Sequence, residues 1–355
     1  MGDKLLIGLN ITVFVTMQCN LRCTYCYEKS EERMSVMSLE TADKIVNFIV
    51  NKIKALGAKK LSVRFHGGEP LIAFDKIDYL VNRLDVTCSQ MVDSIQYTMT
   101  TNFTLYNSIM AATLKKFSSI FVSIDGTEQS HDLNRRYIDG SGSYLDVEHN
   151  VNNAILDGLH IMGRLTLTKQ NYQDVDVNVK SIIHMGIDVV DIELDLVEKQ
   201  WMYIDIDLYI KKIRNIIDYC TFLKNTQDRD VRVPMFTHAA NRPKNTLCDG
   251  GISSFAIMPN GLIYPCTSAV NNKKYLLGDL DGNINEKVLE LLHEVGEQSV
   301  EECRGCTRYE YCATTRCKII NEVYTGNYNK VMPSVCLTEN IDVKIGKLYR
   351  QILNN

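Results

Sequence analysis

The sequence lacks any apolar run close to the roughly 18 residues needed to cross a membrane. Its first residues, MGDKLLIGLN, have no basic segment, long apolar run or cleavage site of the kind found in secretory signal peptides. It also has no excess of positive charge, since 39 Lys and Arg are outnumbered by 43 Asp and Glu, and nucleic-acid-binding proteins usually carry a basic surface. These absences favour a cytoplasmic protein that binds neither membranes nor nucleic acids.

Cysteine, by contrast, is plentiful, with 12 residues among 355. In the reducing cytoplasm, so many thiols are more typical of metal sites than of disulfides. Three cysteines gather near the start, and seven of the other nine lie between Cys248 and Cys336. This uneven distribution predicts two separate metal-binding regions. Cys88 and Cys220 stand alone and are expected to be buried thiols.

Short apolar runs alternate with amphipathic segments over the first two thirds of the chain. One amphipathic segment is predicted to be a helix that is capped by Ser38 and stopped by Gly57. Such strand–helix units are typical of an α/β fold with parallel strands, either barrel-like or doubly wound, whose active site lies at the carboxyl ends of the strands. The predicted strands cover residues 11–16, 61–66, 94–99, 120–124, 161–168 and 189–194.

The character of the sequence changes in the last third, where strands become short and loops long. The polar stretch 226–245 predicts a boundary that divides the chain into domains at 1–235 and 236–355. The second domain is smaller, rich in cysteine and ends in a predicted helix over residues 340–353. Because its apolar pattern is thin, we expect bound metal to help it fold.

The N-terminal cysteine triad, Cys19-x3-Cys23-x2-Cys26, directly follows the first predicted strand. It therefore lies at the end of the sheet where α/β enzymes place their active sites. Three thiolates can hold three irons of a four-iron cubane, which leaves the fourth iron open to a small ligand. An open metal position is typical of catalytic rather than structural sites. A three-thiolate zinc site and a set of buried free thiols are the alternatives.

With Tyr25 directly before Cys26, the triad resembles the C-x3-C-x-aromatic-C signature of the radical S-adenosylmethionine (SAM) superfamily. The resemblance extends over residues 11–195. It implies a partial (β/α)6 TIM-like barrel, in an enzyme that cleaves SAM at a [4Fe–4S] cluster held by the triad. It also places Tyr25 beside the SAM adenine, and packing of this ring on the cluster is the alternative.

Further segments match positions at which this superfamily contacts SAM. Gly67-Gly68-Glu69-Pro70 follows the second predicted strand and, in the superfamily, binds the SAM amino group; paired glycines let a backbone approach a ligand closely. Arg135 matches the arginine that pairs with the SAM carboxylate, which suits a guanidinium fork. A simple surface charge, suggested by the adjacent Arg136, is the alternative. The other predicted SAM contacts, near the ends of the third and fourth strands, are Thr98, Asn102, Ser123 and Asp125.

The cysteines of the last third resemble the SPASM domain of radical SAM enzymes that modify peptides, in which seven such residues support two auxiliary [4Fe–4S] clusters. By that family's interleaved pattern, the first ligand group is Cys248, Cys266 and Cys317. The second ligand group is Cys303, Cys306, Cys312 and Cys336. Two clusters have room for eight ligands, so the first would be completed by Cys220 or Asp249, or would keep an iron open to a substrate thiolate. Zinc bound to the same thiols is the alternative.

The chain departs from these family patterns at three places. Many radical SAM members have Thr-Asn-Gly after the third strand, where this chain has Thr101-Asn102-Phe103. Members with a SPASM domain commonly have three residues between the fifth and sixth cysteines, whereas four separate Cys312 from Cys317. Sulfatase-maturing members carry an Asp, which acts as a base, directly after the second SPASM cysteine. Here that position is Thr267, a poor base at neutral pH.

The combined resemblance implies a radical SAM peptide maturase, which generates a 5′-deoxyadenosyl radical and installs a thioether or carbon–carbon crosslink in a ribosomally synthesised peptide. We expect three partners: the peptide, an external one-electron reductant of the flavodoxin or ferredoxin type, and a separate leader-peptide-binding protein, since only 18 residues precede Cys19. An anaerobic sulfatase-maturing, formylglycine-generating enzyme is the second candidate. An iron–sulfur electron carrier or a zinc scaffold would explain the cysteines but neither the GGEP segment nor Arg135.

Replacing Cys19, Cys23 and Cys26 together by Ala should abolish SAM cleavage and leave iron bound to the C-terminal region, because the two cysteine sets are separate along the chain. Anaerobic assays for 5′-deoxyadenosine, combined with iron content, check this. A triple variant that forms 5′-deoxyadenosine at the parent rate would contradict the assignment of the triad.

Overall fold

A parallel sheet lies at the centre of the computed structural model, which describes residues 8–26, 28, 34–195 and 204–353. Its six parallel strands follow one another in chain order, so that each strand from β2 to β6 pairs with the strand before it. All the strands predicted from the apolar pattern are present. They are β1 (Gly8–Thr16), β2 (Lys60–Gly67), β3 (Ser94–Thr101), β4 (Phe117–Ser123), β5 (Ile161–Leu167) and β6 (Val190–Leu194).

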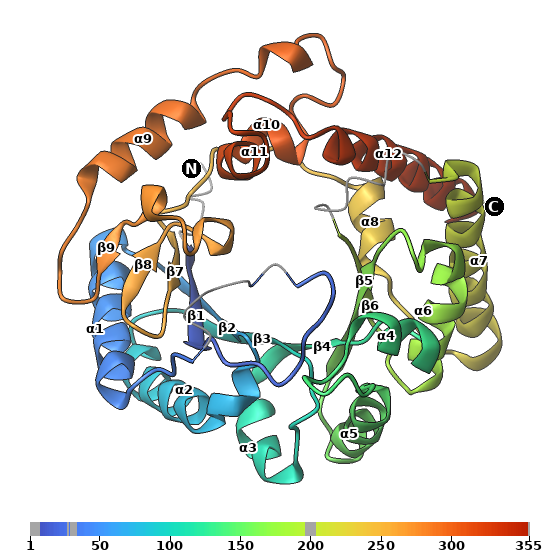
Figure 1. Ribbon diagram of the computed structural model, residues 1–355, viewed down its shortest axis with the longest axis horizontal. Helices are drawn as coiled ribbons and strands as arrows, with labels where there is room; N and C mark the ends of the chain where they lie inside the picture. The colour runs from blue at the N-terminus through green and yellow to red at the C-terminus, as the bar shows by residue number, and fades with distance from the viewer. Residues whose placement is uncertain (1–7, 27, 29–33, 196–203, 354–355) are drawn as a thin grey trace.

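The sheet curls around an open centre, and helices cover its outer face (Figure 1). In β1, Ile11, Val13 and Val15 pack into the core beneath the helices, whereas Phe14 belongs to a second, smaller apolar cluster. This arrangement is the partial (β/α)6 barrel; a doubly wound sheet would have helices on both faces. The helices of this part are α1 (Leu39–Leu56), α2 (Phe74–Cys88), α3 (Ala111–Leu114), α4 (Glu128–Asn134), α5 (Tyr144–Leu156), α6 (Val175–His184) and α7 (Ile206–Gln227).

Helix α1 has the predicted ends. The Ser38 hydroxyl accepts a hydrogen bond from the Thr41 N–H at 3.0 Å, which caps the first turn. Gly57 ends the helix with a left-handed φ of 61°. The lone Cys88, at the end of α2, is fully buried, as predicted.

The C-terminal region continues the same sheet. Strand β7 (Ser254–Ile257) pairs in parallel with β1, and β8 (Leu262–Tyr264) and β9 (Gly278–Asp279) follow as antiparallel strands. The core of the barrel also extends into this region, through side chains such as Phe255 and Ile345. The C-terminal region has a thin apolar pattern of its own, and it is packed because it shares the core of the barrel.

Helices of the C-terminal region span the open side of the barrel. Helix α12 packs against α7 and α8, and Figure 1 shows α10, α11 and α12 completing the ring. The predicted closing helix is present but starts earlier, at Pro333, and the predicted domain limit between residues 235 and 236 falls inside α8. No helix in the described part of the chain is long and apolar enough to cross a membrane. The helices of this region are α8 (Pro234–Ala240), α9 (Glu286–Gly296), α10 (Ala313–Arg316), α11 (Lys318–Thr325) and α12 (Pro333–Leu353).

Candidate active site

The N-terminal triad lies half-buried in residues 17–26, here called the cluster loop, directly after β1. The pKa of the Cys19 thiol is raised to about 11, chiefly by burial and also by negative charge on Cys23 and Cys26, so the three thiols are electrostatic neighbours. Among the residues that the structure describes, no three His, Cys, Asp or Glu side chains converge as ligands of one metal ion. The thiolates of a cubane each bind a different iron and need not converge on one point.

The surroundings of Cys19 fit a ligand of an iron–sulfur cluster. The Leu21 N–H donates to Cys19 Sγ at 3.4 Å, and Asn102 Nδ2 donates to the same sulfur at 3.9 Å. Hydrogen bonds to ligand sulfurs stabilise their negative charge and adjust the reduction potential of the cluster. Asn102 also donates to Asn20 Oδ1 at 2.9 Å, so this predicted SAM contact is held against the cluster loop.

The GGEP segment packs on the start of the cluster loop. A Cβ on Gly67 would lie 2.2 Å from the Thr16 carbonyl oxygen, and one on Gly68 would lie 2.3 Å from the Gln18 carbonyl oxygen. The Gly68 N–H donates to Thr16 O at 3.0 Å, and the Glu69 N–H donates to Gln18 O at 2.7 Å. The sequence pattern predicted that these glycines allow a ligand to come close to the backbone. In the structure, the close neighbour is the protein's own backbone, and it leaves no room for a side chain at either position. This contact sets where the cluster loop leaves the sheet.

The carboxylate of Glu69 is buried and receives three hydrogen bonds from the protein. Oε1 accepts from the Leu71 N–H at 2.9 Å and from the Thr101 hydroxyl at 2.6 Å, and Oε2 accepts from the Asn102 N–H at 2.6 Å. Burial raises the pKa of Glu69 to about 7, and the three donors oppose this rise. Glu69 thus ties the end of β2 to the end of β3, whatever contact it makes with SAM.

Arg135, Asp125 and Tyr25 form a buried polar group beside the cluster loop. Arg135 Nε lies 3.0 Å from Asp125 Oδ2, and Arg135 Nη2 donates to Asp125 Oδ1 at 3.1 Å. The Tyr25 hydroxyl donates to Asp125 Oδ2 at 2.5 Å, and the Arg135 guanidinium lies 5.2 Å from the centre of the Tyr25 ring. Arg135 is only 6% exposed, so its interpretation as a surface charge is wrong.

His131 supports this group through a hydrogen bond to the Asp125 backbone and, by way of Ser143, to the Arg135 backbone. Its Nδ1 accepts from the Asp125 N–H at 3.3 Å, and its Nε2 lies 3.0 Å from Ser143 Oγ. Because Ser143 Oγ donates its own proton to the Arg135 carbonyl at 2.8 Å, the hydrogen-bond network assigns the ring hydrogen to Nε2. Burial lowers the pKa of His131 to about 3, with the positive charge of Arg135 acting in the same direction.

Thr98 and Ser123, two further predicted SAM contacts, lie half-buried on neighbouring strands. Ser123 is the last residue of β4. Thr98, which was expected at the end of the third strand, lies inside β3, because that strand continues to Thr101. Contact of either side chain with SAM stays a prediction.

Phe103 occupies the turn at which many radical SAM members have glycine. Its φ is 62°, a left-handed conformation that bulky residues rarely adopt. Holding an L-residue there costs roughly 1–2 kcal/mol. Full burial of the ring, which stacks on Tyr106 with centroids 4.7 Å apart, offsets this cost by about 1.5–3 kcal/mol. The turn is therefore formed without glycine.

Residues 13–182, which contain all the groups above, match the sequence profile of the radical SAM superfamily. The chain belongs to this superfamily. It is a radical SAM enzyme, and its cofactors are SAM and a [4Fe–4S] cluster. The donor set around the triad, with two hydrogen bonds to Cys19 Sγ, fits that cluster.

Three curated relatives of this radical SAM enzyme cover different parts of it. An uncharacterized protein of Methanocaldococcus jannaschii is 29% identical over 221 residues, which are 61% of this chain and 73% of the relative. The radical SAM cyclopropyl synthase TigE of Paramaledivibacter caminithermalis is 24% identical over 72% of this chain and just 57% of its own length. A cysteine-type anaerobic sulfatase-maturating enzyme of Clostridium novyi is 23% identical over 340 residues, 83% of each chain.

Two solved structures share the whole fold. The protein anSMEcpe with bound AdoMet aligns with a TM-score of 0.78 and 20% identity, over 98% of this chain and 100% of that one. SuiB of Streptococcus suis bound to S-adenosylmethionine aligns with a TM-score of 0.63 and 18% identity, over 93% of this chain and 75% of SuiB. Both were also solved with peptides, anSMEcpe with the Cp18Cys peptide and SuiB with its precursor peptide SuiA.

The C-terminal cysteines of the radical SAM enzyme fall into two electrostatic groups. Apart from burial, the pKa of Cys266 is raised by negative charge on Cys317 and Cys248. The pKa values of Cys303 and Cys336 are each raised by burial and by negative charge on Cys306 and Cys312. The grouping corresponds to the two ligand groups of the SPASM pattern, whose binding of auxiliary clusters stays a prediction.

Cys220 and Asp249, the residues considered for completing the first ligand group, lie in different places. Cys220 is on α7, packs against the core and lies near Tyr349 of α12. Asp249 follows Cys248, and its carboxylate lies 3.5 Å from Arg316 Nη2. The structure therefore places Asp249, and not Cys220, beside the first ligand group.

A charged group on β5 and β6 was not among the predicted site residues. Arg164 lies 2.9 Å from Asp191 and 3.1 Å from Glu193. Arg135 Nη2 donates at 3.3 Å to Thr166, which is two residues after Arg164 on the same strand, so the charged group adjoins the Asp125–Arg135 pair. Partial burial raises the pKa of Glu193, although its side chain is still 49% exposed. Charges at alternate positions of otherwise apolar strands are the sequence signal that identifies such a group.

Arg135→Ala should weaken SAM binding and destabilise the fold. Loss of a charge-assisted hydrogen bond costs roughly 1.5–3 kcal/mol, about ten- to a hundredfold in affinity. Loss of the buried partner of Asp125 costs roughly 3–5 kcal/mol of folding free energy. Equilibrium SAM binding and anaerobic thermal melting measure the two effects, and Arg136→Ala is the control because Arg136 is exposed. A lower melting temperature with unchanged SAM affinity would restrict Arg135 to a structural role.

His131→Gln should reduce the loss of stability on acidification. Folded His131 has a pKa of about 3, below its ordinary value of 6.5, so below pH 6.5 the unfolded chain binds a proton that the folded chain does not. Between pH 7.5 and 5.5 this lowers the free energy of unfolding by about 1.4 kcal/mol. Anaerobic melting midpoints at the two pH values test this, with the exposed His293→Gln as control. Equal pH dependence in the parent and the His131 variant would disprove it.

Proposed function

We propose that this radical SAM enzyme is a peptide maturase, which installs a thioether or carbon–carbon crosslink in a ribosomally synthesised peptide. The observation that carries the proposal is the gathering of the C-terminal cysteines into two groups, in the region that completes the ring around the barrel. These groups would hold two auxiliary [4Fe–4S] clusters. The names of similar proteins support a peptide substrate, since SuiB and anSMEcpe bind peptides.

In this proposal, SAM and the cluster, when bound, supply a 5′-deoxyadenosyl radical that removes a hydrogen atom from the substrate. The chain's own task is to hold and orient these groups. Cys19, Cys23 and Cys26 hold the cluster, and Asp125 fixes the side chains of Tyr25 and Arg135 beside it. The remaining proposed SAM contacts are Gly67, Gly68, Glu69, Thr98, Asn102 and Ser123.

Each crosslink removes two hydrogens from the peptide, one as an atom and the other as a proton plus an electron. We assign acceptance of the proton to Glu193, which pairs with Arg164 and lies opposite Thr166, a hydrogen-bond partner of Arg135. The auxiliary clusters would supply an electron acceptor, and an external reductant of the flavodoxin or ferredoxin type would supply the electron for SAM cleavage. A separate leader-peptide-binding protein completes the proposed set of partners.

We favour a thioether as the crosslink. The first ligand group brings together three thiols, while Cys220 lies elsewhere, between α7 and α12. Arg316 engages the carboxylate of Asp249, which makes that carboxylate a poor fourth ligand. A thiol of the substrate is then the natural fourth ligand, and such coordination keeps it ionised and ready to bond to carbon.

Formylglycine formation is the second candidate, because the Clostridium novyi sulfatase-maturating enzyme matches 83% of this chain. Against it stands Thr267, at the position where sulfatase-maturing members have Asp. Thr267 begins a short 3-10 turn after Cys266, and its hydroxyl is a poor base. Another carboxylate, such as Glu193, would have to act instead.

The neighbouring genes are searched for a short peptide rich in Cys or aromatic residues, and its incubation with the enzyme, SAM and reductant should yield 5′-deoxyadenosine and a crosslinked peptide. Mass spectrometry separates the candidates. A crosslinked peptide loses two hydrogens and keeps its sulfur, whereas formylglycine formed from cysteine has lost the sulfur. Release of 5′-deoxyadenosine with sulfur loss, on a sulfatase-derived peptide only, would overturn the maturase proposal in favour of the second candidate.

A further inference from the structure

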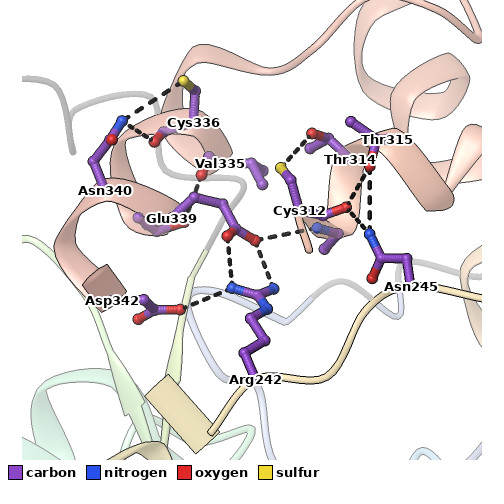
Figure 2. A network of polar contacts seen from close by, with 12 residues as sticks. Arg242, Asn245, Cys312, Thr314, Thr315, Val335, Cys336, Glu339, Asn340 and Asp342 are labelled. Atoms are coloured by element: carbon purple, nitrogen blue, oxygen red, sulfur yellow. Dashed lines mark hydrogen bonds and ion pairs between the residues drawn. The ribbon is translucent and has the colours of Figure 1, made fainter. Parts of the chain in front are cut away.

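A buried ion pair lies next to the segments that carry two cysteines of the second ligand group. Arg242 donates to both carboxylate oxygens of Glu339, at 2.6 Å each, and its Nη1 lies 3.5 Å from Asp342 (Figure 2). The two side chains of the pair are only 12% and 8% exposed. Two parallel charge-assisted hydrogen bonds of this kind hold both groups in one relative orientation.

Glu339 contacts the segments that carry both cysteines. It follows Cys336 by three residues on α12, so the two side chains lie on the same side of the helix. Its Oε1 accepts from the N–H of Ala313, the residue after Cys312, at 3.1 Å. Figure 2 shows its carboxylate directed toward Arg242 and toward the backbone next to Cys312.

The chain that leaves the barrel through Arg242 binds the Cys312 segment a second time. Asn245 Nδ2 donates to the Cys312 carbonyl at 2.6 Å, and the Asn245 N–H donates to the Glu310 carbonyl at 2.6 Å. Cys312 and Cys317, one from each ligand group, flank the short helix α10, so their Cα atoms lie roughly 7–8 Å apart along its axis. Asn245 directly, and Arg242 through Glu339, therefore contact the segment that connects the two ligand groups.

Charge is the second effect of this pair. A negative charge on Glu339 near a cluster opposes the arrival of an electron, and the positive charge of Arg242 cancels most of that effect. Both groups are buried, so water and salt screen them weakly. Lys244 and Glu310 form a similar pair at 2.8 Å on the same two segments, but each side chain is 62% exposed. Solvent therefore screens that pair strongly.

We propose that Arg242 and Glu339 are positioning residues of the second auxiliary cluster, which hold Cys312 and Cys336 in place and set the reduction potential of that cluster. The inference rests on the proposed function, because it assumes that the second ligand group binds a cluster. The inference adds two residues outside the cysteine pattern, and their charges shift the reduction potential of the cluster in opposite directions.

The test compares Glu339→Gln, Arg242→Gln and the double variant in anaerobic redox titrations of the full, reconstituted chain, followed by electron paramagnetic resonance and iron content. The signal of the second cluster is the one lost in Cys306→Ala. At a fixed ambient potential, the ratio of reduced to oxidised cluster should rise about tenfold in Glu339→Gln and fall about tenfold in Arg242→Gln, a shift of about 59 mV each for one electron. The double variant should return close to the parent.

Glu310→Gln is the matched control, because it removes the same charge from an exposed pair two residues before Cys312 and should leave the potential unchanged. Equal potentials in all variants, or shifts of one sign in both single variants, would overturn the inference. Loss of the second cluster in the double variant would support the positioning role and overturn the effect of the pair on the reduction potential. If a single variant loses iron, its potential is not compared. The test then depends on whether the double variant has the potential of the parent. A parent without the Cys306-dependent signal would instead contradict the auxiliary clusters of the proposed function, and this inference with them.

Discussion

The buried contact between Asp125 and Arg135 is the interaction on which the active site depends. One carboxylate receives the guanidinium, the Tyr25 hydroxyl and the N–H of Thr166, and so joins the cluster loop to β5. Without its cationic partner, this carboxylate would be buried and uncompensated, a state that costs more than most other contacts contribute. Neutral His131 completes the arrangement because a second positive charge at that place would repel Arg135.

The continuous sheet fixes the position of the C-terminal region relative to this site. Because β7 pairs directly with β1, the chain that carries the C-terminal cysteines begins beside the strand that leads into the cluster loop. The same region returns across the open side of the barrel and packs through α12 on α7 and α8. A small cysteine-rich region thus gains a core that it would not have alone, and both ligand groups acquire defined positions relative to the barrel.

Local patterns were sufficient for much of the fold. Short apolar runs marked all six barrel strands, and the residues that cap α1 act within their own turn. The spacing of the triad was sufficient to predict a cluster with an open iron, because the three ligands come from one loop. Thr98 was placed too close to the strand end, since the final residues of β3 are polar and resemble a loop. Phe103 was recognised as a departure, yet its left-handed turn could not be foreseen from a residue that rarely adopts it.

The sequence by itself therefore determined the strand–helix order, the cysteine ligand sets as predictions and the superfamily that they resemble. The tertiary structure alone decided which polar groups became partners. It buried Arg135 while leaving Arg136 exposed, and it brought Arg242 to Glu339 across 97 residues. The physical reason is that burial and ion pairing depend on which strand ends and helices meet in space. Side chains so far apart in the chain leave no local pattern that records their contact.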